Sequence, residues 1–112
     1  MSAALYSVFV TGSAGSNIVL LYVDDKVVGG IDAGTGQYRG TAVRLPDGGL
    51  RGTVQLTVKP GQPLLTGGVA PEGMPAIPIQ FDLPPNFDDA RTILITTPIG
   101  PVNARFEKLM EI

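Results

Sequence analysis

The strongest constraint on this chain is an alternation of apolar and polar residues, which is clearest over residues 50–59. Leu50, Val54, Leu56 and Val58 share one phase of the alternation, with a glycine at the remaining position, and the other phase holds Arg, Thr, Gln, Thr and Lys. Successive side chains of a β-strand point to opposite faces of the sheet. The pattern therefore predicts a strand with one buried face and one solvated face.

The same pattern recurs between turn segments, and no stretch has the period of a helix long enough to cover a sheet. We expect strands at residues 5–10, 18–23, 26–31, 37–45, 50–59, 77–83, 91–97 and 102–112. Residues 107–112 could also form a helical turn, although a strand is favoured. Strands without helices must cover one another, as in a sandwich or a barrel. Closure into a barrel removes exposed edges, so we expect an all-β fold: a small antiparallel up-and-down β-barrel of about eight strands, lipocalin-like.

Two local features refine this expectation. Pro78 lacks an amide donor, which places its strand at a sheet edge or at a bulge. The segment 60–75 is rich in Gly and Pro and is predicted to be a loop, with Leu64 and Leu65 folding back onto the core. The hairpin over residues 38–59, with its Pro-Asp-Gly-Gly turn, is the best defined.

Composition excludes several kinds of chemistry. The 112 residues predict one domain, residues 1–112, without Cys or His, which excludes disulfides and cysteine zinc sites and removes the usual proton-transfer side chain. The net charge is -2 and the basic residues are scattered, so no nucleic-acid partner is expected. No long apolar run and no basic leader are present, so we expect a cytoplasmic protein without a membrane partner. Only 16% of residues are charged, which favours self-association.

No constellation of residues predicts catalysis. The adjacent carboxylates Asp24-Asp25 and Asp88-Asp89 are typical of turns, because neighbouring side chains diverge and do not share a proton. The glycine-rich segment 12–16 lacks the lysine and the helix of a phosphate loop. We expect no catalytic residue, no metal and no cofactor, and hence no enzyme. A hydrolase would have to use Asp and Lys alone.

Three motifs occur in order in the first half of the chain. These are Leu-Tyr-Ser-Val-Phe at residues 5–9, Gly-Gly-Ile-Asp at 29–32 and Tyr-Arg-Gly at 38–40, followed by a turn and the strand from Leu50. The order resembles the GrlR-like family, named for the negative regulator of a bacterial type III secretion locus, over residues 4–59. That family has Gly-Gly-Asp where this chain has an inserted isoleucine.

The resemblance implies a lipocalin-type barrel that forms a homodimer and acts through protein–protein contacts. The type member represses by binding a transcriptional activator protein rather than DNA, partly through an exposed acidic loop between two strands. The corresponding turn here, residues 45–49, reads Leu-Pro-Asp-Gly-Gly and is flanked by Arg44 and Arg51. The acidic contact therefore does not carry over, and the identity of a regulatory partner does not follow.

Two functions are consistent with these observations. The first is a non-enzymatic GrlR-like regulatory or binding module that acts as a homodimer and contacts a regulatory protein. Residues 18–23 are apolar on both faces of their predicted strand, as a strand covered on two sides would be. The predicted dimer interface is Ile18, Leu20, Tyr22 and Val27.

The alternative is a carrier or sensor that binds a small apolar ligand inside the barrel. It requires a cavity of a few hundred cubic ångströms, and a barrel filled by its own side chains would exclude it. The predicted lining is Tyr38, Val54, Leu56, Ile79, Phe81, Leu94 and Phe106.

Overall fold

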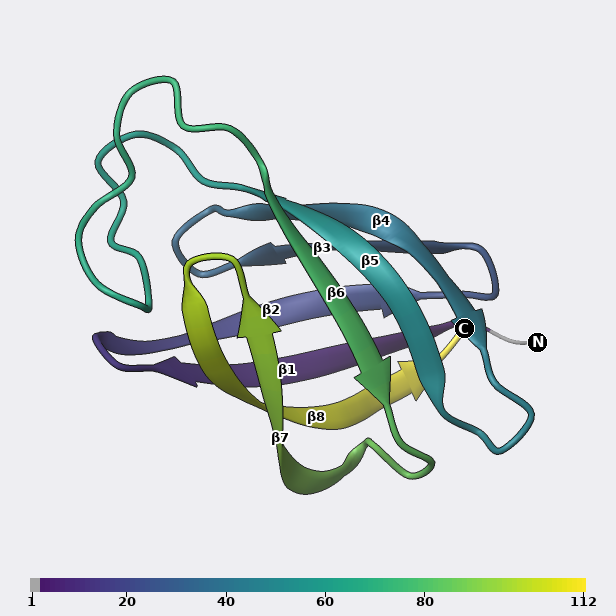
Figure 1. Cartoon of the computed structure of the whole chain (residues 1–112). Coiled ribbons are helices and arrows are strands. Elements are labelled where there is room, and N and C mark those ends of the chain that lie inside the picture. The colour runs from purple at the N-terminus through teal and green to yellow at the C-terminus, as the bar shows by residue number, and fades with distance from the viewer. Residues whose placement is uncertain (1–2) are drawn as a thin grey trace.

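The computed structural model describes residues 3–112 and contains one antiparallel sheet of eight strands, without a helix in that range (Figure 1). The strands are β1 (Ala4–Gly12), β2 (Gly15–Val23), β3 (Val27–Asp32), β4 (Gln37–Arg44), β5 (Leu50–Thr57), β6 (Ile77–Leu83), β7 (Asp89–Thr97) and β8 (Gly100–Glu111). All eight predicted strands are confirmed, and the chain end is a strand rather than a helical turn. Residues 1 and 2 of the predicted domain lie outside the described residues.

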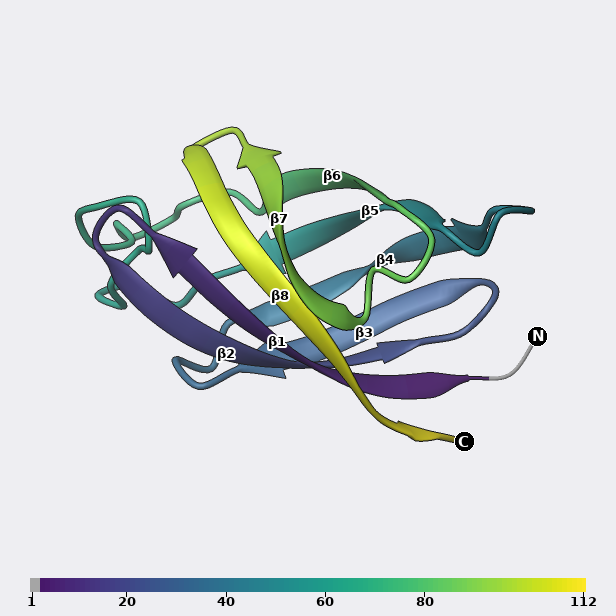
Figure 2. The same ribbon diagram turned by 90° about the horizontal axis from the view of Figure 1, so that it is seen from below.

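The sheet curls into a nearly closed barrel. Its strand order is β6-β5-β4-β3-β2-β1-β8-β7, so β8 crosses back to pair with β1. The predicted all-β barrel is confirmed, and Figures 1 and 2 show the strands wrapped around a common interior. The strand ladder ends at β6 and β7, which lie next to each other in space but do not pair, so the barrel is nearly closed. Pro78 lies in β6, which is an edge strand, as predicted.

Glycines on the inner face let β4 and β5 approach closely. Gly40 pairs with Val54, and Ala42 pairs with Gly52. A Cβ built on Gly40 would overlap the carbonyl oxygen of Thr53 and would lie 2.7 Å from the Cα atom of Val54. The close approach of β4 and β5 therefore requires a residue without a side chain at position 40.

The two ends of the barrel differ. The start of β1, the C-terminus and the turns 24–26, 45–49 and 84–88 lie at one end, and the turns 13–14, 33–36 and 98–99 lie at the other (Figures 1 and 2). The first end is filled by an aromatic cluster, in which the ring of Phe87 lies 5.5 Å from those of both Tyr6 and Phe106. These rings are almost fully buried, together with Leu50 and Leu83. We call this end the packed end.

Replacing Gly40 by alanine is expected to lower the free energy of unfolding by about 1–3 kcal/mol, because the added methyl group is forced against the backbone of β5. Urea denaturation would measure the change. Gly29→Ala is the control, since its Cβ would meet nothing closer than the Tyr38 carbonyl oxygen at 3.9 Å. An equal effect of both substitutions would contradict the close-approach explanation.

Candidate ligand cavity

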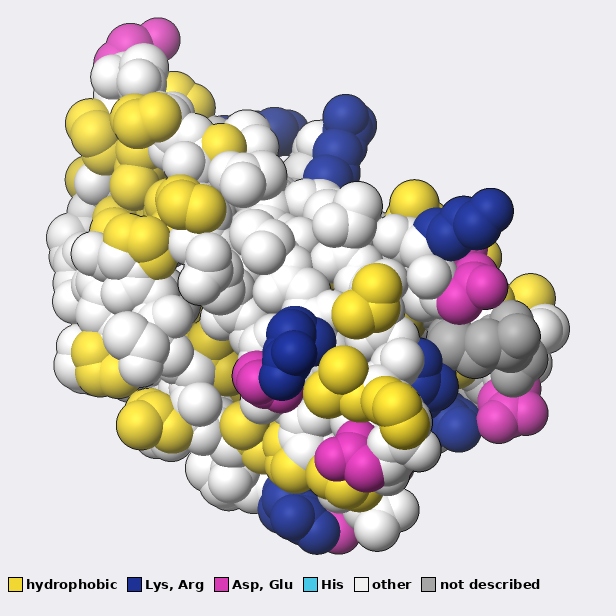
Figure 3. All heavy atoms as spheres, turned by 45° about the vertical axis from the view of Figure 1, so that its right-hand side comes forward, with side chains coloured by type: hydrophobic (Ala, Val, Ile, Leu, Met, Phe, Trp, Pro, Cys, Tyr) yellow, Lys and Arg dark blue, Asp and Glu magenta, His cyan; other side chains and the backbone are white. Residues whose placement is uncertain are grey.

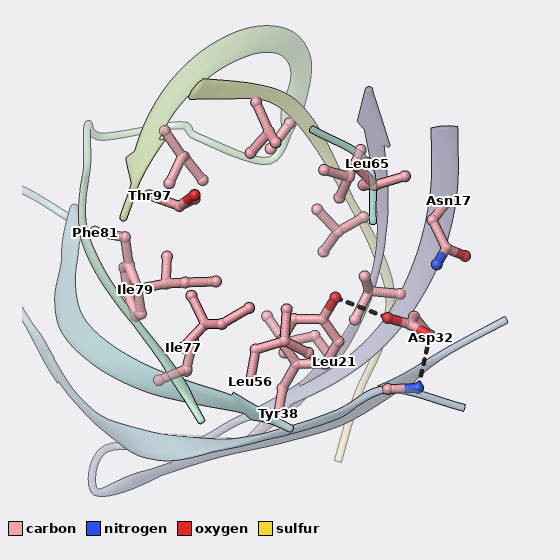
Figure 4. A pocket seen from close by; sticks show the side chains of 18 of the residues that line it. Asn17, Leu21, Asp32, Tyr38, Leu56, Leu65, Ile77, Ile79, Phe81 and Thr97 are labelled. Carbon is pink, nitrogen blue, oxygen red and sulfur yellow. Dashed lines mark hydrogen bonds between the residues drawn. The ribbon is translucent and has the colours of Figure 1, made fainter. Parts of the chain in front are cut away.

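A cavity of about 450 Å³ occupies the barrel interior and extends to the end opposite the packed end. Figure 4 shows Leu21, Leu56, Ile77 and Ile79 directed into it from β2, β5 and β6. Leu56 and Ile79 are only half-buried although they face inward, because no other side chain fills the space before them. The wall of the cavity is therefore apolar and incompletely filled.

Six of the seven predicted lining residues lie on this cavity. They are Tyr38, Val54, Leu56, Ile79, Phe81 and Phe106. Val54 and Phe106 are buried in the core, whereas Tyr38, Leu56, Ile79 and Phe81 are half-buried. Inward-pointing side chains of four different strands thus line the same cavity.

Leu94 was predicted wrongly. Its side chain is 65% exposed and faces outward from β7. Residues 93–95 are apolar in both phases of the alternation, so their own pattern does not settle which face points inward. Pairing with β8 does settle it, because Ile95 lies opposite Val102 and Leu94 opposite the exposed Asn103. Ile95 and Thr97 are the residues of β7 that line the cavity.

The loop between β5 and β6, residues 58–76, covers the hollow end of the barrel (Figure 1). Leu64 and Leu65 of this loop line the cavity, as their predicted return to the core implied. The backbone N–H of Ala14 in the β1–β2 turn donates to the carbonyl oxygen of Leu65 at 2.8 Å. A Cβ on Gly12 would overlap this same carbonyl oxygen, so the loop rests directly on the β1–β2 hairpin.

Polar side chains gather at the hollow end and form the rim of the cavity. Asp32, the last residue of β3, accepts hydrogen bonds at Oδ1 from the backbone N–H groups of Gly34 (2.9 Å) and Gly36 (2.8 Å). Its Oδ2 accepts a hydrogen bond of 2.9 Å from the hydroxyl of Tyr38. Asn17 and Gln62 belong to the same lining. The cavity thus has an apolar body and one polar margin.

The environment of Tyr38 keeps its hydroxyl protonated. Burial raises the pKa of Tyr38 well above its ordinary value, and the negative charge of Asp32 and the hydrogen bond to it raise the pKa further. Tyr38 is therefore a permanent donor to Asp32, and it connects the apolar wall to the rim.

The four predicted interface residues all lie on the outer surface of the barrel. Ile18, Leu20 and Val27 are 52%, 47% and 46% exposed. Tyr22 is half-buried, and its hydroxyl donates to Asp24 at 2.9 Å; this hydrogen bond raises the pKa of Tyr22. The outer side of residues 18–23 is thus uncovered within one chain.

Asp24 and Asp25 lie between β2 and β3, as predicted for a turn, and Asp88 lies in the β6–β7 turn, whereas Asp89 is the first residue of β7. Asp24 accepts hydrogen bonds of 2.7 Å from the backbone N–H groups of Lys26 and Val27 in the β2–β3 turn, and these bonds lower the pKa of Asp24. Asp89 accepts a hydrogen bond of 2.9 Å from the guanidinium of Arg91. Within residues 3–112 no group of three or more acidic side chains is arranged to hold a metal ion.

Basic and acidic side chains lie next to one another on the face of the molecule shown in Figure 3, with hydrophobic side chains between them. One exposed ion pair joins Arg51 to Asp82 at 3.0 Å. Charge on this face is therefore mixed in sign.

Comparisons of the chain with family models, with curated proteins and with solved structures returned no significant match. None of the described residues forms a helix long and apolar enough to cross a membrane.

The rim was not predicted from the sequence, where Asp32 has a place only in the Gly-Gly-Ile-Asp motif and Asn17 has no assigned role. Counting in steps of two from the buried Val28 would have placed Gly30 and Asp32 on the inner face. No comparable signal exists for Gln62, because loop residues have no alternation to count.

Alanine substitutions in β7 test the assignment of its two faces. Ile95→Ala is expected to lower the free energy of unfolding by about 2 kcal/mol or more, because it removes apolar packing inside the barrel. Leu94→Ala is the matched control on the outer face and is expected to change it by only about 0.5 kcal/mol. Thermal or urea unfolding measures both. A larger loss for Leu94→Ala would contradict the orientation described.

Proposed function

We propose that this protein binds a small apolar molecule inside its barrel and acts as a carrier or sensor rather than as an enzyme. The observation that carries the proposal is the cavity of about 450 Å³ with its predominantly apolar lining. Binding sites for small molecules fall in the range of about 300–1,000 Å³ and combine apolar walls with a few polar groups. The cavity has both properties.

The energetics of an apolar cavity support this use. Water gains few hydrogen bonds against aliphatic and aromatic walls, so such cavities accept apolar guests instead. Leu56, Ile79 and Phe81 present half-buried surface to the cavity, and a ligand would remove this surface from water. Each square ångström of apolar surface buried contributes about 25 cal/mol to binding before the costs of association.

A tryptophan placed inside the cavity tests the proposal. The wild-type chain is expected to bind a neutral, environment-sensitive fluorescent dye, and Leu56→Trp is expected to weaken this binding at least about tenfold, because the indole occupies the space. Leu94→Trp adds the same side chain to the outer face and should leave the affinity unchanged.

Ligand-induced stabilisation provides an independent measurement. A ligand at about 100 times its Kd stabilises the folded state by about 2.7 kcal/mol, which a thermal shift detects. Absence of dye binding to the wild-type chain, or equal weakening by both tryptophan variants, would contradict the proposal.

A second candidate function is a regulatory module of the GrlR-like type that acts as a homodimer and contacts another protein. It is favoured by one surface feature, which we call the outer apolar face and define as Phe9, Ile18, Leu20, Ile31 and Leu109. These side chains are 43–54% exposed. Pairing of Phe9 with Ile18 and of Leu20 with Ile31 places them on adjacent strands. An apolar face of this kind is typical of association sites.

A charge placed in the outer apolar face tests the dimer. The wild-type chain is expected to sediment as a dimer at micromolar concentration, and Leu20→Lys as a monomer, because a lysine in the centre of the face would have to lose its hydration. Leu94→Lys, on the outer side of β7, is the control and should stay dimeric. A wild-type monomer would rule out this second candidate without affecting the first.

A further inference from the structure

The cavity carries charge of only one sign. Among the described residues that line it, Asp32 is the only acidic residue, and no lysine or arginine is present. The four salt bridges found within residues 3–112 do not include Asp32. Neutral donors alone hold its carboxylate, so its negative charge is not neutralised by an ion pair.

The hydrogen bonds of Asp32 leave an acceptor position open. A carboxylate offers about four lone-pair positions. The amides of Gly34 and Gly36 occupy two positions on Oδ1, and the Tyr38 hydroxyl occupies one on Oδ2. Figure 4 shows the Asp32 carboxyl at the margin of the cavity, next to the Tyr38 hydroxyl. Oδ2 can therefore accept one more donor.

Asn17 adds a donor beside this acceptor. Its Oδ1 atom accepts hydrogen bonds from the backbone N–H groups of Ile18 (2.8 Å) and Ala33 (3.2 Å), which orients the amide. A Cβ built on Gly34 would lie 3.4 Å from Asp32 Oδ1, 3.8 Å from Asn17 Nδ2 and 3.4 Å from an oxygen of Gln62. The three polar side chains thus converge on one point of the rim.

We propose that the ligand is an apolar molecule with one hydrogen-bond-donating head, a hydroxyl or an amino group, which lies against Asp32 while the apolar body fills the cavity. This inference rests on the proposed function. A hydroxyl can donate to Asp32 and accept from Asn17, and a protonated amine pairs with the carboxylate through a charge-assisted bond. A carboxylate head would place a second negative charge beside Asp32 with no cation in the lining.

The test compares three ligands that share one alkyl chain: decanol, decylamine and decanoate. Displacement of a neutral fluorescent dye from the full chain at about pH 7.5, where decylamine is protonated and decanoate is ionised, gives the three affinities. Decanol and decylamine are each expected to bind at least about tenfold more tightly than decanoate. A decanoate affinity equal to that of either other ligand overturns the inference.

Asp32→Asn tests the residue itself, because asparagine keeps an oxygen for the amides of Gly34 and Gly36 and removes the charge. The variant is expected to weaken decylamine and to strengthen decanoate, so that their difference falls below about threefold. Asp82→Asn, on an exposed carboxylate of β6, is the matched control and should change neither affinity.

The outcomes separate the two proposals. Failure of the dye and of all three ligands to bind contradicts the cavity function itself. Binding of all three with equal affinity, or an unchanged preference in Asp32→Asn, overturns the role of Asp32 and leaves the cavity function standing. If Asp32→Asn does not fold, the wild-type series decides alone.

Discussion

The pairing of β8 with β1 is the interaction on which the rest of this structure depends. It runs from Ala4↔Glu111 to Thr11↔Asn103 and brings the last strand alongside the first. The inner face of an antiparallel sheet has to be covered, and here β7 and β8 supply Ile95, Ala104 and Phe106 to cover it. The register shift beside Leu5 leaves one extra residue in β8, and such bulges increase the local bend of a strand.

Uneven filling of this barrel produces the candidate site. Aromatic rings close the packed end, where Phe87 lies between Tyr6 and Phe106. Toward the other end the inner face carries Gly30, and half-buried aliphatic side chains do not reach across the interior. Protein interiors are normally close-packed, so a space of about 450 Å³ is a departure that needs an explanation. A bound apolar molecule supplies one.

The rim shows how a loop and a strand end combine to make a polar margin. Asp32 ends β3, and its carboxylate organises the turn that follows by accepting from Gly34 and Gly36. The same carboxylate receives the hydroxyl of Tyr38 from β4. One side chain thus stabilises the turn and sets the charge at the cavity opening, so the local structure and the proposed ligand preference have a common origin.

The inward face was predictable for strands with clean alternation and was not predictable for strands without it. The inward face of β5, where Leu50 and Val54 are buried, follows directly from the alternation of residues 50–59. β7 is apolar in both phases, and only its register against β8 turns Leu94 outward. The lack of pairing between β6 and β7 was not predicted either, although Pro78 had indicated that its strand lies at a sheet edge.

The sequence by itself determined the strand content, the turns and most of the inner face, because a period of two is a local property that each strand displays independently. The tertiary structure alone decided that the barrel is hollow, that residues 58–76 cover its open end, and that Asn17, Asp32 and Gln62 meet at one rim. These features depend on the volume left between strands and on contacts between distant segments. Neither quantity is contained in the pattern of any single strand.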